Sequence, residues 1–145
     1  MAVTATAYQS FSVNLMTSKI SDLSSATSDI RVMLLANTYI ADMAAHEDIG
    51  DVNANEITGI GYTAGGAALA NKVVNLVGGK AVLDADDTSW SASTFIARYA
   101  VIYDNTAVTT TDKKLIALVD LGDVKSPENG TFRLEWDASG IIQLG

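Results

Sequence analysis

Short apolar segments separated by glycine, asparagine and aspartate recur along most of this chain, and this spacing restricts what it can fold into. Each segment has the length of a strand, and the residues between segments favour turns. The pattern predicts an all-β fold, a two-sheet β-sandwich or jelly-roll-like domain of about eight strands. The expected strands cover residues 30–36, 67–77, 80–84, 88–91, 95–103, 114–121, 131–136 and 141–144.

Some of these segments carry more specific signals. Gly78-Gly79 predicts a two-residue hairpin connection, because glycine reaches the positive φ angles of such turns. Residues 95–103 are apolar on both faces, and so is Ile30–Ala36, which we expect to be a central strand. Together the strands hold more apolar surface than one sandwich core needs. We expect either an N-terminal helix and the long segment 37–61, or another subunit, to cover the surplus.

A short N-terminal helix is expected over residues 8–17. Tyr8, Phe11 and Leu15 lie three and four positions apart, so they share one side of such a helix. The polar residues expected to face away are Ser10, Asn14 and Thr17. Residues 1–7 alternate small and β-branched side chains without the bulk to anchor a core. We expect them to be either a frayed tail or an arm that orders on a neighbour.

Composition and charge limit the size of the fold and its partners. The chain has 145 residues, of which 48% are hydrophobic and 18% charged, as expected for one folded domain over residues 1–145. Nine basic against seventeen acidic residues give a net charge of −8, the wrong sign for a nucleic-acid partner. No apolar run approaches the roughly 20 residues that span a bilayer, so no membrane partner is expected. Without cysteine, disulfides and thiolate metal sites are excluded.

Residues that carry catalytic or metal chemistry are few, and none forms a recognised pattern. His46 precedes two carboxylates, but a metal or general-base role needs further ligands or a nucleophile. Asp84, Asp86 and Asp87 lack the glycine and closing glutamate of a calcium loop, which favours a solvated turn. The stretch Gly59–Gly66 lacks the Lys-Ser/Thr ending of a phosphate loop. We therefore predict no catalytic, cofactor-binding or metal-binding residues; a hydrolase that uses paired carboxylates ranks last.

The aromatic residues admit two interpretations. Trp90 and Trp136, with Tyr62, Tyr99 and Tyr103, are numerous enough to line a sugar-binding face. Aromatic side chains on strands are more often part of the core, because each buries a large apolar area. We expect these five in the core and keep the sugar-binding face as the alternative.

Several blocks of the chain occur together in a fixed order over roughly residues 8–144. They are Asp29–Leu35, Thr38-Tyr39, His46-Glu47, Asp51-Val52, Glu56–Leu69, Asp84–Thr94, Ala97–Tyr103, Asn129–Phe132 and Trp136–Ile141. This set resembles a family of small virion structural proteins from tailed bacteriophages.

The resemblance implies a non-enzymatic particle component, most directly a capsid cement or decoration protein that stabilises the head shell. It implies contacts with the major capsid protein or other virion proteins, on the outer capsid surface, after assembly in the cytoplasm of the bacterial host. An acidic domain with surplus apolar strands suits such contacts and a homo-oligomer. The alternatives are a tail or fibre-attachment component of the virion and a carbohydrate-binding β-sandwich module.

Overall fold

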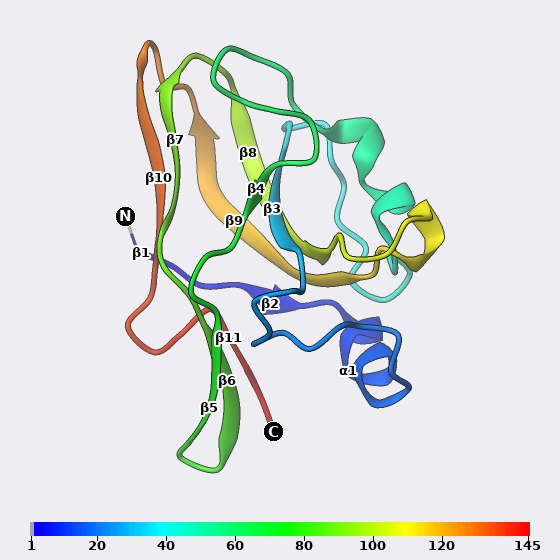
Figure 1. The fold of residues 1–145 in the computed structure, drawn as a ribbon. Coiled ribbons are helices and arrows are strands. Elements are labelled where there is room, and N and C mark those ends of the chain that lie inside the picture. The colour runs from blue at the N-terminus through cyan, green and yellow to red at the C-terminus, as the bar shows by residue number, and fades with distance from the viewer. Residues whose placement is uncertain (1) are drawn as a thin grey trace.

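A computed structural model describes residues 2–145 as an all-β, sandwich-like fold with one α-helix, which confirms the predicted class (Figure 1). The strands in this range are β1 (Ala2–Val3), β2 (Thr6–Ala7), β3 (Ile30–Leu35), β4 (Ala67–Ala68), β5 (Val73–Val77), β6 (Lys80–Asp84), β7 (Thr88–Ser93), β8 (Ala97–Asp104), β9 (Leu115–Lys125), β10 (Gly130–Trp136) and β11 (Ile142–Leu144). The helices are α1 (Gln9–Met16) and the 3-10 turns η1 (Ile49–Asp51), η2 (Asn53–Asn55) and η3 (Thr110–Asp112). Each of the expected strands has a counterpart.

The largest sheet has five strands in the order β2-β9-β8-β3-β4. Its central strands β3, β8 and β9 pair antiparallel. Successive side chains of a strand point to opposite faces, so Val32 and Leu34 lie on one face of β3 and Met33 and Leu35 on the other. All four are buried. The prediction of a central strand covered on both faces is therefore confirmed.

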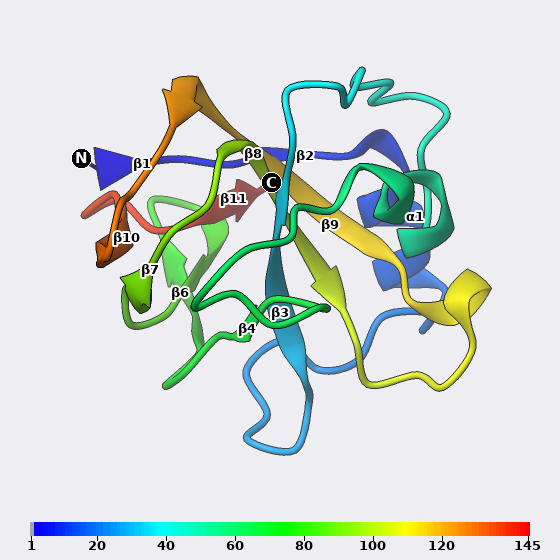
Figure 2. The same ribbon diagram turned by 90° about the horizontal axis from the view of Figure 1, so that it is seen from above.

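The second layer is divided into two sheets, β1-β10-β7 and β11-β6-β5, which corrects the expectation of two sheets in all. Seen from above, β7 and β10 lie on one side of the five-stranded sheet and the 3-10 helices on the other (Figure 2). The two small sheets separate at the connection from β6 to β7 and at the connection from β10 to β11. There the Asp87 carboxylate accepts a hydrogen bond from the backbone N–H of Trp136 at 2.9 Å. A side chain thus takes the place of a strand partner, and the ladder is interrupted.

Two groups of buried side chains cover the two faces of the large sheet. The larger group lies between this sheet and the second layer and includes Trp90, Trp136 and Leu134. The smaller group lies on the opposite face, where Tyr39 and Val52 of the long segment 37–61 pack with residues of β3 and β8. The chain therefore covers much of its apparent surplus of apolar surface with its own segment.

Residues 2–7 belong to the sheets, which corrects the interpretation of this segment as a tail or an arm. β1 pairs in parallel with β10, where Val3 aligns with Trp136, and β2 pairs antiparallel with β9. Between them the backbone N–H of Ala5 donates to the carbonyl of Ile141 at 3.2 Å. Small and β-branched side chains suit these positions, because the segment runs close to both layers and Val3 is buried. Met1 lies outside the described residues.

Two further expectations need correction. The helix forms over Gln9–Met16, within the predicted range, but Asn14 is buried and does not face away. Asn14 follows Phe11 by three positions, which places it only about 60° from Phe11 around the helix. The expected strand 67–77 is interrupted at Asn71, whose φ is 53°. Because of this left-handed residue, β4 and β5 lie in different sheets.

Candidate protein-binding surface

His46 belongs to a partly buried chain of hydrogen bonds. Its Nδ1 lies 2.8 Å from the Tyr39 hydroxyl, which lies 2.9 Å from the Tyr8 hydroxyl. Burial raises the pKa of Tyr8, and its hydrogen bond with Tyr39 raises it further, so the phenol stays protonated. The three side chains join α1 to the segment that covers the large sheet.

The three aspartates of the predicted acidic turn are held separately. Asp84, Asp86 and Asp87 accept hydrogen bonds from the Ala85 backbone, the Asn71 amide, and Arg133 with the Trp136 backbone, respectively. The hydrogen bond from the Trp136 backbone, followed by that from Arg133, lowers the pKa of Asp87. Within residues 2–145 no cluster of three or more His, Asp or Glu side chains is placed to hold a metal ion. The turn is a structural junction.

The glycine-rich stretch is a tightly packed connection over β3. A Cβ on Gly66, where φ is +83°, would lie 1.9 Å from the carbonyl oxygen of Val32. The Glu56 carboxylate accepts hydrogen bonds from the backbone N–H of Gly65 at 2.6 Å and from the Tyr62 hydroxyl at 2.9 Å. The loop is therefore held by the chain's own groups and does not present a row of free N–H donors.

Most of the aromatic residues are in the core, as expected. Trp90 and Trp136 are only 6% and 7% exposed, and Trp90 stacks on Phe132 with ring centroids 5.9 Å apart. Trp136 also donates its indole N–H to the Asp86 carbonyl at 3.1 Å. Tyr103 is buried, and Tyr62 and Tyr99 are half-buried. The two tryptophans needed for a sugar-binding face are thus not on the surface.

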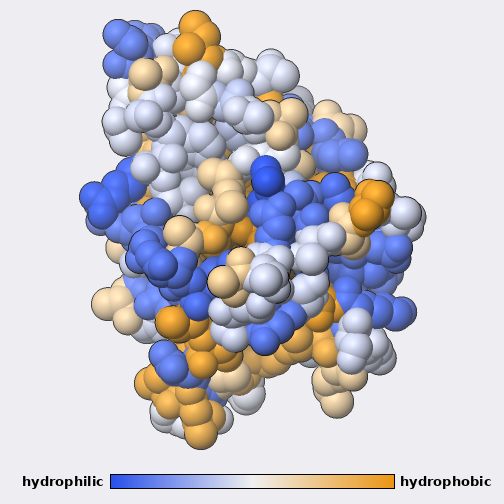
Figure 3. Space-filling model, in the orientation of Figure 1, coloured by the Kyte–Doolittle hydropathy of each residue, from blue (hydrophilic) through white to orange (hydrophobic). Residues whose placement is uncertain are grey.

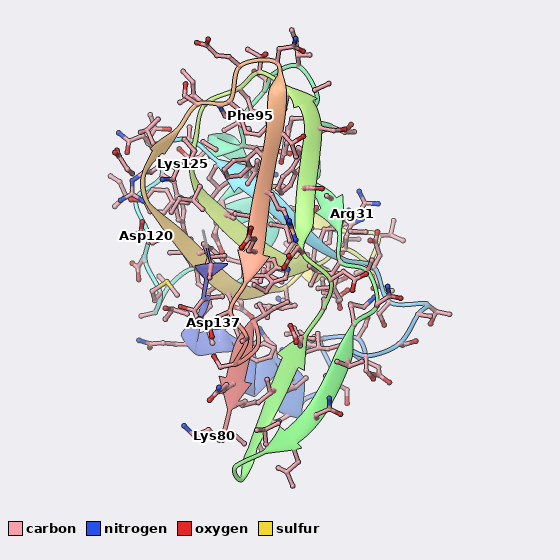
Figure 4. All side chains as sticks on the ribbon, turned by 90° about the vertical axis from the view of Figure 1, so that its left-hand side faces the viewer. Arg31, Lys80, Phe95, Asp120, Lys125 and Asp137 are labelled. Carbon is pink, nitrogen blue, oxygen red and sulfur yellow. The ribbon has the colours of Figure 1, made fainter. Side chains whose placement is uncertain are left out.

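The β5–β6 hairpin, residues 73–84, carries four exposed large apolar side chains on one strand. All five residues of β5 are exposed, with Leu76 at 79% and Val77 at 60%. The hairpin projects from the rest of the sandwich (Figure 1), and apolar surface gathers at its end of the molecule (Figure 3). Lys80 marks its tip, far from Phe95 at the other end (Figure 4). This exposure leaves an apolar surface open to a partner.

The two faces of the hairpin differ in what lies beneath them. Val74 aligns with Leu83, and both line a small apolar cavity of about 50 Å³ against Phe11 and Leu15 of α1. Leu76 follows on the same face, does not line this cavity and is 79% exposed. The opposite face presents the side chains of Val73, Asn75 and Val77.

β5 is also an unprotected sheet edge. It lies at the end of the order β11-β6-β5, so no strand of residues 2–145 pairs with the other side of its backbone. Proteins usually protect such edges with charged residues, proline or a bulge. β5 contains only Val73, Val74, Asn75, Leu76 and Val77, and its pairing with β6 is regular. The hairpin therefore offers backbone hydrogen-bonding groups together with apolar side chains.

The charge around the hairpin differs from that of the rest of the chain. Lys72 and Lys80 against Asp84 give residues 72–84 a net charge of +1. The rest of the chain therefore carries −9, and the two parts sum to the net charge of −8. A protein partner is thus not repelled at the hairpin as it is elsewhere on an acidic surface.

The fold and this surface define an all-β, sandwich-like protein with an open, uncharged sheet edge. Comparison with family models, with curated proteins and with solved structures gave no match to this chain. Among residues 2–145 no helix has the length and apolar character needed to cross a bilayer. The sequence predicted the hairpin but not its exposure; the available signal was an apolar strand with no charge, next to Gly78-Gly79.

Proposed function

We propose that this chain is a non-enzymatic structural protein of a bacteriophage virion, a cement or decoration protein that binds the head shell. The observation that carries the proposal is β5, an exposed apolar strand without a charged residue that lies at the edge of its sheet. The ordered sequence blocks that resemble phage virion proteins support the same role.

The energetics of the hairpin favour a protein contact. Burying one large apolar side chain contributes about 1.5–3 kcal/mol, and the hairpin exposes several of them side by side. Leu76 and Val77 lie next to each other in sequence on opposite faces, so a partner that encloses the hairpin buries both.

The histidine and one of the aspartates considered for catalysis or cation binding have hydrogen-bond partners within the fold. His46 is bonded to Tyr39, and Asp87 joins two strands. This arrangement supports a binding role in which the major capsid protein or other virion proteins are the partners. The proposed location is the outer capsid surface, after assembly in the cytoplasm of the host bacterium.

Co-sedimentation with head shells tests the proposal. The purified chain is mixed with shells that lack it, and the bound fraction is measured over a range of concentrations. Val77→Asp places a charge on the exposed hairpin and should weaken binding at least about tenfold, which corresponds to 1.4 kcal/mol. Val108→Asp is the matched control, because Val108 is 93% exposed and lies far from the hairpin in sequence, in the loop before η3. No binding by the wild-type chain, or equal losses for both variants, would contradict the proposed role of the hairpin.

Labelling this chain on intact particles shows whether it lies on the head or on another part of the virion. If the labelled chain is found on the tail or the fibre base, that part of the virion replaces the head shell as the proposed binding site. Binding to a glycan array would instead favour the carbohydrate-binding alternative, which has no exposed tryptophan to support it.

A further inference from the structure

The free side of β5 has a defined hydrogen-bonding pattern. Gly78 and Gly79 have φ of 58° and 80°, so they form a two-residue turn in which Val77 and Lys80 are a hydrogen-bonded pair. Hydrogen-bonded pairs alternate along an antiparallel ladder. Val73, Asn75 and Val77 therefore direct their backbone groups toward β6, and the residues between them direct theirs outward.

The outward groups belong to Val74 and Leu76. No hydrogen bond joins them to another element of residues 2–145. A strand that pairs with this edge must bond to the N–H and C=O of these two residues. In an antiparallel pairing, only the registers that align outward groups with outward groups satisfy this requirement.

The sequence of β5 is self-complementary about its middle residue. It reads Val-Val-Asn-Leu-Val, so an antiparallel copy centred on Asn75 places Val74 opposite the partner's Leu76 and Val73 opposite the partner's Val77. Val74 and the partner's Leu76 then exchange both backbone hydrogen bonds, and so does the symmetric pair. Every apolar side chain of the strand faces another apolar side chain.

We propose that two copies of this chain pair through their β5 edges, antiparallel and around a two-fold axis at Asn75. The order of the combined sheet is β11-β6-β5 followed by β5-β6-β11 of the partner. A two-fold interface requires that one surface complement itself, and the sequence of β5 meets that requirement. This inference deepens the proposed function, on which it rests for the role of the hairpin in protein contacts, by naming a second copy as the partner at the β5 edge.

Charge favours contact between two copies at their β5 edges over contact between their other surfaces. Each chain carries −8, so contacts between most of their surfaces bring carboxylates together. The paired β5 strands contain no charge, and each glycine tip lies beside the partner's Lys72 without adding a side chain. β5 contributes 5 residues a side, far fewer than the roughly 20–30 a side of standard-size interfaces, so we expect a weak dimer with a Kd of roughly micromolar order.

Disulfide trapping tests both the pairing and its register. Asn75→Cys brings two thiols together at the two-fold axis, in a non-hydrogen-bonded pair whose Cα atoms lie about 4.5 Å apart, within disulfide range. Val77→Cys is the matched control, since it is exposed on the same face but lies opposite Val73 of the partner. The chain has no native cysteine to interfere. Under mild oxidation we expect the 75 variant to form a covalent dimer at least tenfold faster than the 77 variant.

Charge exchange at the same position gives an independent test. Asn75→Lys alone, and Asn75→Asp alone, place like charges face to face across the axis and should raise the dimer Kd in sedimentation velocity at least tenfold. An equal mixture of the two variants should restore dimers, because each Lys then meets an Asp. A merely local effect on the hairpin would not be rescued by mixing.

The outcomes separate this inference from the proposed function. Wild-type chain that stays monomeric up to about 1 mM, far above the expected micromolar Kd, would overturn β5 pairing, as would equal trapping at positions 75 and 77 or failure of the mixture to dimerise. If that monomer still co-sediments with head shells, the virion role stands without the dimer. A dimer with the expected trapping that binds no shell would keep the pairing and remove the virion role.

Discussion

Gly66 and Gly78 have positive φ angles but very different surroundings. A Cβ at Gly66 would lie 1.9 Å from the Val32 carbonyl oxygen, whereas nothing lies within 4 Å of one at Gly78. The left-handed conformation costs an alanine about 1–2 kcal/mol at either position. Only at Gly66 must backbone atoms also move.

We therefore expect Gly66→Ala to lower the free energy of unfolding by about 3 kcal/mol or more, and Gly78→Ala by about 1 kcal/mol. Urea denaturation of both variants measures the difference. Equal losses would show that the glycine-rich loop is not packed against β3 as described.

The junction at Asp87 should make stability depend on acid pH. Hydrogen bonds from the Trp136 backbone and from Arg133 hold the pKa of Asp87 below its ordinary value of 3.8. A carboxyl with a lower pKa in the folded state stabilises the fold above its unfolded pKa, and this contribution is lost as pH falls through the folded pKa. The free energy of unfolding should therefore decrease below about pH 4.

Asp87→Asn tests the contribution of this one residue, because the amide oxygen still accepts a hydrogen bond from Trp136 but does not titrate. The variant should show a shallower loss of stability than the wild type between about pH 4 and pH 2. It should not abolish the loss, since the pKa values of other aspartates are also lowered, namely those of Asp22, Asp51, Asp120 and Asp137. Identical pH profiles would exclude Asp87 from the acid response.

At the scale of elements, the sequence predicts best what depends on neighbours along the chain. A continuous apolar run located β3, alternating side chains located β8 and β10, and Gly78-Gly79 located the hairpin turn. The pairing of β1 with β10 joins the two ends of the chain, and two-residue strands carry no period to detect. The interruption at Asn71 was missed for a different reason. Several residue types take a left-handed φ angle, so an asparagine alone does not mark such a break.

The candidate site illustrates the same limit. Val73–Val77 has the composition of a buried strand, and the sequence does not state whether another strand follows it in the sheet. Exposure depends on sheet order, which is a property of the whole fold. The absence of charge from β5 is visible in the sequence, but it becomes informative only once β5 is known to be an edge.

Deletion of residues 2–7 should destabilise the fold, because this segment provides two strands and a buried side chain. Loss of Val3 burial alone is expected to lower the free energy of unfolding by about 1.5 kcal/mol or more, and the unpaired edges of β9 and β10 add to the loss. Thermal unfolding followed by circular dichroism measures the change in Tm. Thr4→Ala is the control, since Thr4 is exposed and should leave Tm nearly unchanged. An unaltered Tm after deletion would restore the interpretation of the segment as an arm.

For the molecule as a whole, the apolar strands serve two purposes. The large sheet is apolar on both faces because the second layer covers one face and the segment 37–61 covers the other. Of the large apolar side chains that stay exposed within residues 2–145, four lie together on β5, where the hairpin forms one end of the molecule (Figure 3). An acidic body with one uncharged edge directs association to a single place, which suits a subunit that must bind at a defined position on a larger assembly.

Salt provides the test of this view at the scale of the molecule. Two copies bring their charges of −8 together, while the proposed contact between β5 strands is apolar and uncharged. Raising the salt concentration from about 0.05 M to about 0.5 M screens the repulsion between the two bodies and leaves the contact itself unaffected. The dimer Kd measured by sedimentation velocity should therefore fall several-fold. If ion pairs between the hairpin lysines and carboxylates of the partner held the dimer instead, the same change would raise the Kd, so the sign of the salt effect distinguishes an apolar edge contact from an electrostatic one.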